Sequence, residues 1–214
     1  SFANTKASRN SLLWVGAQDG MLHGFRASTG EPVLSYVPSP VVAQLSAAFD
    51  VSNTGATPLV DGSPFTGDVL IGSGTAAAWR TYLYGSLGRG GKAVFALDVT
   101  DPSTLNEAQA SSVFKWVFSA QDDADLGHVL MEPQRHNASG QATPLVRLNS
   151  GGFGVLVPNG YRSVNGRAAL FILDAAGPGS TGWKDSAGSP QAYRKLLTAA
   201  TDTDNGLMGL TWVD

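Results

Sequence analysis

Short runs of alternating hydrophobic and polar residues, separated by turns that contain glycine, make up most of this chain. The first two runs, 11–18 and 21–27, flank the dipeptide Asp19-Gly20. A tight turn between antiparallel strands needs a positive φ, which glycine adopts without steric cost. The pattern therefore predicts a β-hairpin, followed by a third strand at 32–37.

The second strand of this hairpin recurs twice along the chain, each time with a Phe followed closely by a polar turn. The residues concerned, Phe25, Phe95 and Phe171, lie about 70 to 76 positions apart. That spacing is too large for one four-stranded sheet and suits large repeats decorated with loops. We expect the three Phe side chains to be equivalent core residues of successive blades. The fold class is therefore predicted to be all-β, in the form of a β-propeller.

Further strand patterns follow along the rest of the chain, at 57–60, 68–71, 79–83, 92–99, 113–118, 143–148, 153–158 and 168–175. A short surface helix is predicted at 41–49, because apolar residues and alanines there follow helical spacing. The polar stretch 120–140 and the segment 177–190, rich in Gly, Ser and Pro, are predicted to be loops. Residues 209–214 begin another strand pattern.

The composition agrees with one all-β unit rather than several small domains. The 214 residues include 26 Gly and 11 Pro, and only 14% of them are charged. The formal net charge is −3 and no basic run interleaves with aromatic residues, so nucleic acid is not expected as a partner. No apolar stretch is long enough to cross a bilayer, and the chain is not expected to span a membrane.

Two acidic segments invite comparison with cation sites. Residues 201–206 contain alternating Asp, but glycine comes one position early for an EF-hand-like loop and no bidentate acidic residue follows at the required distance. We expect a turn there instead. The cluster Asp122-Asp123-Ala124-Asp125 follows an apolar strand, and a solvated loop is expected rather than a metal site.

The sequence shows no catalytic constellation. His23 lies in a strand pattern beside Phe25, which favours a hydrogen-bonded structural role over that of a general base. The glycine-dense segment 85–91 lacks the hydroxyl residue that a phosphate-binding loop places after its lysine, so a turn between strands is predicted. The chain is not expected to be an enzyme, and no catalytic or cofactor-binding residue is assigned.

Several short motifs between the repeats occur in a specific order and spacing: 60–64, 79–81, 85–91, 95–102, 125–127, 159–161 and 205–211. Over most of its length, from about residue 11 onward, the chain resembles the C-terminal propeller of the PilY/PilC family. Members of this family are large type IV pilus biogenesis factors and tip-associated adhesins of Gram-negative bacteria. The structural motif positions are Asp19, Gly20, Asp61, Gly62, Trp79, Gly91, Asp98, Asp101, Gly160 and Tyr161.

The resemblance implies a modified seven-bladed propeller. Residues 1–214 would then form roughly its first half or slightly more, as a single partial domain that is truncated at its C-terminal end. In the family, a calcium loop follows the segment that matches 206–213, so this loop is expected just beyond Asp214. No metal ligand is therefore assigned within the chain, and Ca²⁺ is expected for the full-length domain only.

The resemblance also implies a non-enzymatic module that supports type IV pilus assembly and extension and contributes to cell adhesion. Its implied partners are minor pilins and the pilus tip complex, with host-cell or surface receptors in addition. The implied location is extracellular, at the outer-membrane surface and the pilus tip, reached through the periplasm.

Two other classes of function stay open. The segment 16–30 also resembles the repeat of pyrroloquinoline-quinone (PQQ) dehydrogenase propellers, although no Trp follows Thr29-Gly30 to dock neighbouring blades and the vicinal cysteines of those enzymes are absent. The second alternative is a lectin-like binding propeller that is unrelated to pili. Bound quinone absorbance would identify the first, and capture of minor pilins would argue against the second.

Overall fold

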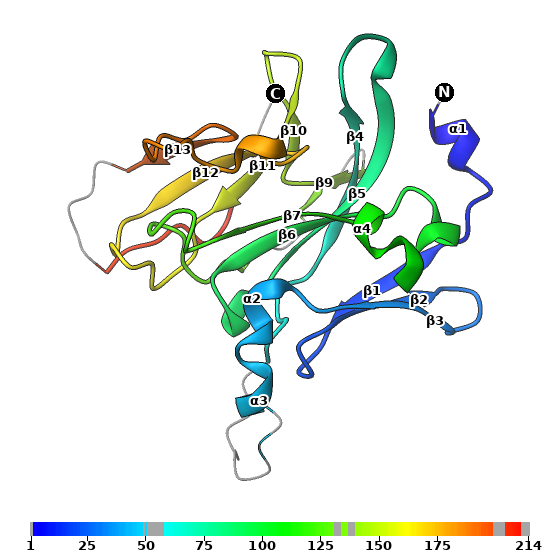
Figure 1. Ribbon diagram of the computed structural model, residues 1–214, viewed down its shortest axis with the longest axis horizontal. Coiled ribbons are helices and arrows are strands. Elements are labelled where there is room, and N and C mark those ends of the chain that lie inside the picture. Colours follow the sequence, from blue (N-terminus) through cyan, green and yellow to red (C-terminus); the bar gives the residue numbers. More distant parts are fainter. Residues whose placement is uncertain are drawn as a thin grey trace.

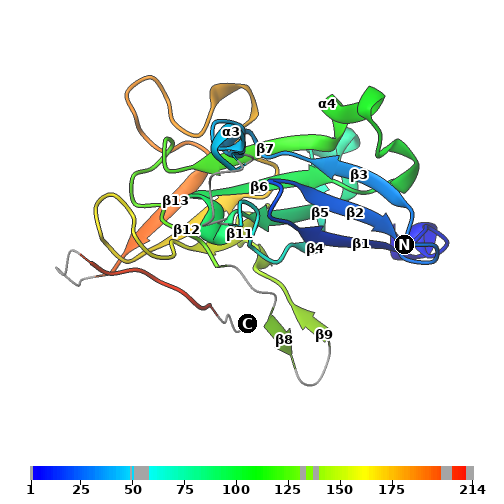
Figure 2. The same ribbon diagram turned by 90° about the horizontal axis from the view of Figure 1, so that it is seen from below.

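The fold consists of three antiparallel sheets that lie side by side as successive blades (Figure 1, Figure 2). The computed structural model describes residues 2–48, 50, 58–130, 134–136, 140–198 and 204–210. Blade 1 contains β1 (Leu12–Gly16), β2 (Leu22–Arg26) and β3 (Pro32–Tyr36). Blade 2 contains β4 (Phe65–Ile71), β5 (Ala78–Ser86), β6 (Ala93–Asp98) and β7 (Phe114–Ser119). Blade 3 contains β10 (Leu145–Arg147), β11 (Phe153–Pro158), β12 (Ala169–Asp174) and β13 (Tyr193–Leu197).

Short elements connect the blades. A two-stranded hairpin, β8 (Gln134–His136) and β9 (Gly140–Ala142), leads from blade 2 to blade 3. The helices are α1 (Phe2–Lys6), α2 (Ser39–Val42), α3 (Leu45–Ala48) and α4 (Ala110–Val113). Single 3₁₀ turns lie at Gly74–Ala76, Gly88–Gly90, Pro102–Thr104, Glu107–Gln109 and Gly179–Thr181.

Most of the expected strands are confirmed, and four details differ. Residues 58–60 are not a strand: the N–H of Val60 donates to the carbonyl of Ala17 at 3.4 Å, and the segment serves as a linker between blades. The expected helix at 41–49 is two short helices, α2 and α3. The polar stretch 120–140, which is expected to be a loop, contains β8. Strand β13 has no counterpart among the expected strands. Residues 57, 49 and 211–214 lie outside the described part of the chain.

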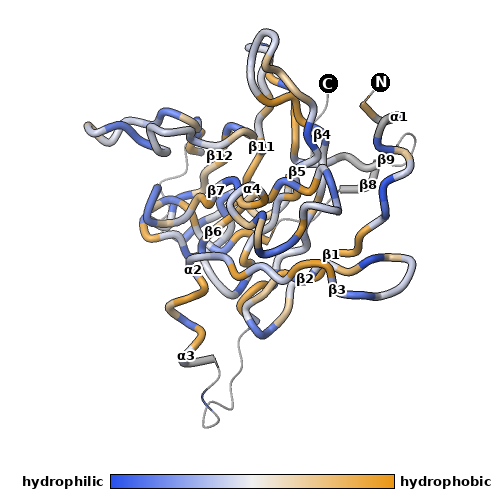
Figure 3. The backbone as a smooth tube through the Cα atoms, turned by 45° about the vertical axis from the view of Figure 1, so that its right-hand side comes forward, coloured by the Kyte–Doolittle hydropathy of each residue, from blue (hydrophilic) through white to orange (hydrophobic). Residues whose placement is uncertain are grey.

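The three blades pack against each other through two hydrophobic cores, one between each pair of neighbours. The core between blades 1 and 2 includes Leu22, Leu83 and Phe95, and the core between blades 2 and 3 includes Phe118 and Phe171. Strand β6 contributes to both, because its alternate side chains point to opposite faces of the sheet. The hydropathy of the backbone follows this arrangement, with hydrophobic stretches along the strands and in α2 (Figure 3).

The expected equivalence of the three Phe residues is correct for two of them and wrong for the third. Phe95 and Phe171 are buried, with exposed fractions of 1% and 0%. Phe25 is only half-buried and belongs to neither core. The strand pairing explains this result, because the register shifts at the same place in both blades. The shift falls between Gly24 and Phe25 of β2, opposite an extra residue in β3, and between Ala96 and Leu97 of β6, opposite an extra residue in β7. Phe25 therefore corresponds to Leu97, and the residue that corresponds to Phe95 is His23.

Candidate functional site

The motif positions of the sequence do not converge on one site but lie at the two ends of the blades. One end, here called the junction end, carries the turns that enter β2, β6 and β12 together with the linkers between blades. Its motif residues are Asp19, Gly20, Asp61, Gly62, Gly91, Gly160 and Tyr161. The other end, here called the hairpin end, carries the turn between β4 and β5 and the residues that follow β6. Its motif residues are Trp79, Asp98 and Asp101.

At the junction end, the linker from blade 1 to blade 2 passes against the loop that precedes β6. The backbone N–H of Asp61 donates to the carbonyl of Leu87 at 3.2 Å. A Cβ atom on Gly62 would overlap the side chain and carbonyl of Ser86, so only glycine permits this close approach. Arg89 adds an exposed contact of 3.7 Å to the carboxylate of Asp61. The Asp-Gly motif therefore fixes the entry into blade 2.

The next linker is held to blade 3 in a similar way. The N–H of Gly127 donates to the carbonyl of Asn159, and the N–H of His128 donates to that of Tyr161, both at 2.8 Å. The rings of His128 and Tyr161 stack with centroids 5.1 Å apart. The Nδ1 atom of His128 lies 3.0 Å from the carbonyl of Gly88, which belongs to blade 2. Each linker thus contacts both of the blades that it joins.

Substitution of Gly160 by Ala is expected to cost considerably more stability than the same change at Gly30. Both glycines have a positive φ, 71° and 74° respectively, so both pay the same strain of about 1 to 2 kcal/mol. A Cβ on Gly160 would also overlap the carbonyl of His128, whereas nothing lies within 4 Å of one on Gly30. Urea unfolding of the two variants measures the difference, and equal midpoints would contradict the junction geometry.

A cluster of charged side chains joins the loop after β7 to blade 3. Asp123 and Asp125 are 5% and 0% exposed, and Lys195 on β13 places its Nζ 2.9 Å from Asp123 and 2.7 Å from Asp125. Arg167 binds Asp125 at 2.9 Å through its guanidinium. The hydroxyl of Tyr193 donates to Asp123 at 2.8 Å. The solvated loop expected for this segment is therefore wrong for these two carboxylates.

Hydrogen bonds and ion pairs within this cluster outweigh burial in setting the pKa values of its carboxylates and its lysine. Burial alone would raise the pKa of Asp123 and Asp125, but the hydrogen bonds from Lys195 and other donors hold both pKa values below the ordinary one. Burial likewise opposes the charge of Lys195, and its hydrogen bonds to the two carboxylates raise its pKa. Burial and the bond from its hydroxyl to Asp123 raise the pKa of Tyr193. All three ionic groups are therefore charged at neutral pH.

These carboxylates do not fit a calcium site, because cationic side chains already occupy their oxygens. Across the described ranges, no group of three or more His, Asp or Glu side chains could hold a metal ion. Of the acidic turn at 201–206, residues 201–203 lie outside the described part of the chain. Asn205 directs its side-chain oxygen to the N–H of Gly206, at 2.8 Å.

We expect calorimetric titration of this chain with Ca²⁺ to show no site tighter than roughly millimolar, because the Asp202 segment has too few oxygen ligands in the right spacing. An Asp202→Ala variant should give the same titration. A micromolar site that disappears in this variant would contradict the expectation.

At the hairpin end, Trp79 is exposed rather than buried. Its side chain is 43% exposed and makes an edge contact with Phe153 of blade 3, with centroids 5.7 Å apart. Asp98 and Asp101 shape the turn after β6, where they accept hydrogen bonds from the N–H groups of Thr100 and Ser103, each at 3.0 Å. The bonds from Ser103 hold the pKa of Asp101 below its usual value.

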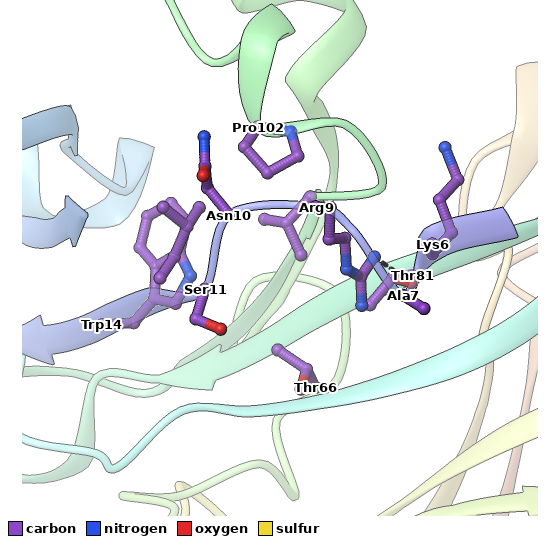
Figure 4. A pocket seen from close by; sticks show the side chains of 11 residues that line it. Lys6, Ala7, Arg9, Asn10, Ser11, Trp14, Thr66, Thr81 and Pro102 are labelled. Carbon is purple, nitrogen blue, oxygen red and sulfur yellow. Dashed lines mark hydrogen bonds between the residues drawn. The ribbon is translucent and has the colours of Figure 1, made fainter. Parts of the chain in front are cut away.

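A polar cavity of about 300 Å³ opens between the N-terminal segment and blade 2 (Figure 4). Lys6 and Arg9 lie at its rim, and Thr66 and Thr81 project from β4 and β5. The guanidinium of Arg9 donates to the hydroxyl of Thr81 at 2.9 Å. Neither cation forms an ion pair with a carboxylate anywhere in the described part of the chain.

His23 has the structural role expected for it. Its Nε2 atom lies 2.8 Å from a carboxylate oxygen of Asp19, and its Nδ1 atom lies 2.8 Å from the hydroxyl of Ser35. Asp19 also accepts the N–H of Met21 at 3.0 Å, and Gly20 adopts a φ of 87°. The pair thus stabilises the β1–β2 turn.

None of the helices in the described part of the chain is long and apolar enough to span a membrane.

Antiparallel sheets packed face to face, with the described parts of each linker bonded to the two blades that it joins, define the chain as a β-propeller protein. The chain belongs to the family of the PilY1 β-propeller domain, whose model matches residues 1–209. This result confirms both the expected fold class and the resemblance to pilus biogenesis factors.

The relatives carry consistent names. The type IV pilus biogenesis factor PilY1 of Pseudomonas aeruginosa PAO1 is 36% identical over 176 residues, which are 81% of this chain and 13% of that protein. A PilY1 homolog of Xylella fastidiosa is 34% identical over 174 residues, again 81% of this chain and 13% of that protein. The crystal structure of the P. aeruginosa PilY1 C-terminal domain matches with a TM-score of 0.69 and 33% identity, over 100% of this chain and 35% of that one.

Proposed function

We propose that this chain is a non-enzymatic, pilus-associated propeller portion that supports type IV pilus assembly and extension and contributes to adhesion. The observation that carries the proposal is the match of residues 1–209 to the PilY1 propeller, together with relatives named as pilus biogenesis factors. The proposed partners are minor pilins, the pilus tip complex and surface receptors. The proposed location is the outer-membrane surface and the pilus tip.

The packing of the blades supports a mechanical and interfacial role. Two continuous cores and the linkers tied to both neighbouring blades give a rigid body, from which the loops project. The hairpin end presents exposed apolar side chains, Leu70 and Trp79, beside the cations Lys6 and Arg9. Exposed aromatic and arginine side chains are enriched in protein contact surfaces, and Trp79 and Arg9 are of these types. For the full-length domain we further propose that Ca²⁺ binds outside residues 1–214.

The test uses a strain that lacks the gene for the full-length protein and receives it back in several versions. The unmodified protein should restore surface pili, counted by electron microscopy, and attachment to surfaces. A version that lacks residues 1–214 should restore neither. A Gly160→Ala version should restore less than the matched Gly30→Ala version, with protein amounts compared by immunoblot.

Counting pili in a background that cannot retract them separates an effect on pilus assembly from an effect on pilus retraction. Normal numbers of pili and normal attachment without residues 1–214 would overturn the proposal. Quinone absorbance in the protein after reconstitution would favour the dehydrogenase alternative instead. The names of the matched relatives, which are pilus biogenesis factors, favour the pilus role over that alternative.

A further inference from the structure

Two β-hairpins, β4–β5 of blade 2 and β10–β11 of blade 3, project from the hairpin end of the molecule (Figure 1). Near their tips, the rings of Trp79 and Phe153 meet at an interplanar angle of 73°, with centroids 5.7 Å apart. The ring of Phe2 in α1 stacks against Trp79 as well, with centroids 6.4 Å apart. Aromatic side chains therefore hold the two hairpins together.

Two arginine side chains flank this aromatic contact. Arg80 follows Trp79 along β5, and Arg147 lies directly opposite Phe153 in the register of β10 and β11. Side chains directly opposite each other in an antiparallel pair have Cβ atoms about 4.5 to 5.5 Å apart and lie on the same face of the sheet. Arg80 shares its face of β5 with Tyr82, which belongs to the core between blades 2 and 3. Phe153 packs against the same core, so both arginines lie on the faces through which these blades meet.

These side chains are exposed although they lie where two blades meet. Trp79 is 43% exposed, and Leu70, which lies opposite it on β4, is 38% exposed. Arg80 and Arg147 are also exposed, and neither forms an ion pair within the described ranges. We call the set of Leu70, Trp79, Arg80, Arg147 and Phe153 the aromatic–arginine patch. It belongs entirely to blades 2 and 3, which have four strands each.

The turns at the tips of the two hairpins fix the position of the patch. In β10–β11, the N–H of Leu148 donates to the carbonyl of Gly152 at 2.8 Å. In β4–β5, the N–H of Ala76 donates to the carbonyl of Ser73 at 3.2 Å, and residues 72–78 are all Gly, Ala, Ser or Thr. A surface that is ordered before binding loses less conformational entropy when a partner docks. The small residues at the tip leave space for that partner beside Trp79.

We propose that the aromatic–arginine patch binds an acidic segment of a partner protein, with an apolar side chain of that segment against Trp79 and its carboxylates on Arg80 and Arg147. A planar guanidinium binds a carboxylate through two parallel hydrogen bonds. Trp and Arg are among the side chains that carry most of the binding energy in protein interfaces. The inference rests on the proposed pilus role, to which it adds the chemistry of one partner contact.

Charge complementarity favours this occupant. The two guanidinium groups gain ion pairs from an acidic partner without losing any that they make in the described part of the chain. The formal net charge of −3 disfavours a long polyanion such as a nucleic acid, which the rest of the chain would repel. Because Arg80 and Arg147 come from different hairpins, we expect a segment with acidic residues on both sides of an apolar one.

The first test places a photocrosslinking amino acid at Ala78 of the full-length protein in cells that make pili. The control position is Val164, which is 72% exposed in the loop between β11 and β12. We expect a crosslink from position 78 to a segment of another protein with acidic residues around an apolar one, identified by mass spectrometry of the joined peptides. Position 164 should not give this product. No crosslink from position 78, a crosslink to a segment without acidic residues, or a crosslink only to the same polypeptide would overturn the proposal.

The second test reverses both charges of the patch in the double variant Arg80→Glu, Arg147→Glu. The yield of the crosslink from position 78 should fall at least about tenfold, because carboxylates then face carboxylates. Lysine in place of the acidic residues of the captured segment should restore the yield with this variant. Arg162→Glu is the matched control, since Arg162 is exposed and has no ion pair within the described residues. An equal loss in this control, or no recovery with lysine, would contradict the charge pairing.

The third test removes the aromatic part of the patch with Trp79→Ala, which should lower the crosslink yield at least about tenfold. Phe114→Ala is the matched control, because Phe114 is 41% exposed and stacks on Tyr36 outside the patch. Thermal unfolding checks that both variants are folded. A normal yield with Trp79→Ala, in strains where deletion of residues 1–214 abolishes pili, would refute the patch and leave the proposed pilus role intact. Normal pili after that deletion would refute the pilus role itself.

Discussion

Phe171→Ala is expected to lower the free energy of unfolding by about 3 to 5 kcal/mol, which corresponds to a fall in melting temperature of about 6 to 20 °C. Phe171 is 0% exposed and makes an edge contact with Phe118, with ring centroids 5.3 Å apart. Its removal leaves a cavity in the core between blades 2 and 3, because β12 and β6 hold the surrounding side chains in place.

The matched control is Phe25→Ala, which removes the same side chain from a half-buried position. Its contacts include the ring of His23, with centroids 6.1 Å apart, and no core residue of either cluster. We expect a loss well below that of Phe171→Ala, with Phe95→Ala close to Phe171→Ala. Thermal and urea unfolding followed by circular dichroism measure all three. Equal losses at 25 and 171 would show that the assigned register is wrong.

Lys195→Met is expected to destabilise the protein by about 3 kcal/mol at pH 7, because it leaves two buried carboxylates without their shared cation. In the unmodified protein, the pKa values of Asp123 and Asp125 are depressed by hydrogen bonds that outweigh burial. Their contribution to stability is therefore present above the unfolded pKa of about 4 and is lost as the pH falls through the lower folded values.

Without Lys195, Asp123 keeps only neutral donors against its burial, so its pKa rises and the sign of its contribution to the pH dependence reverses, while Arg167 still binds Asp125. The variant should lose stability as the pH rises from about 4 to 7, whereas the parent is stable over this range. Lys115→Met is the control. Lys115 is similarly exposed, but its Nζ lies 4.0 Å from the carboxylate of Asp98, a longer and weaker contact. Urea unfolding at pH 4 and 7 decides the matter. A constant difference between Lys195→Met and the parent across this range would refute the buried pairing.

Hydrophobic periodicity and turn chemistry were sufficient to predict the blades. The strands at Leu12–Gly16 and Ala169–Asp174 alternate clearly and end at glycine or Asx turns. Strand β13 was missed because its Tyr193–Leu197 sequence carries two basic residues at its centre. One of them, Lys195, bonds the buried carboxylates, which no local pattern could indicate since its partners lie 70 and 72 positions away.

The same limitation applies to the other errors. Asp123 and Asp125 look like a solvated cluster in sequence, and only tertiary contacts reveal their burial. Phe25 was aligned with Phe95 by identity of residue type, while the bulge that fixes the register is a property of strand pairing. The sequence shows that the motif contains glycines but not why glycine is needed there. The backbone that approaches Gly160 belongs to His128, more than thirty positions earlier.

Strand β6 separates two cores and contributes to each, with Val94 and Ala96 facing blade 3 and Phe95 and Leu97 facing blade 1. Within the described residues, blade 1 and blade 3 each share one of these cores with blade 2, so unfolding of either blade leaves the other core in place. Unfolding of blade 2 removes both at once. Blade 2 is therefore the template on which either of its two neighbours can refold.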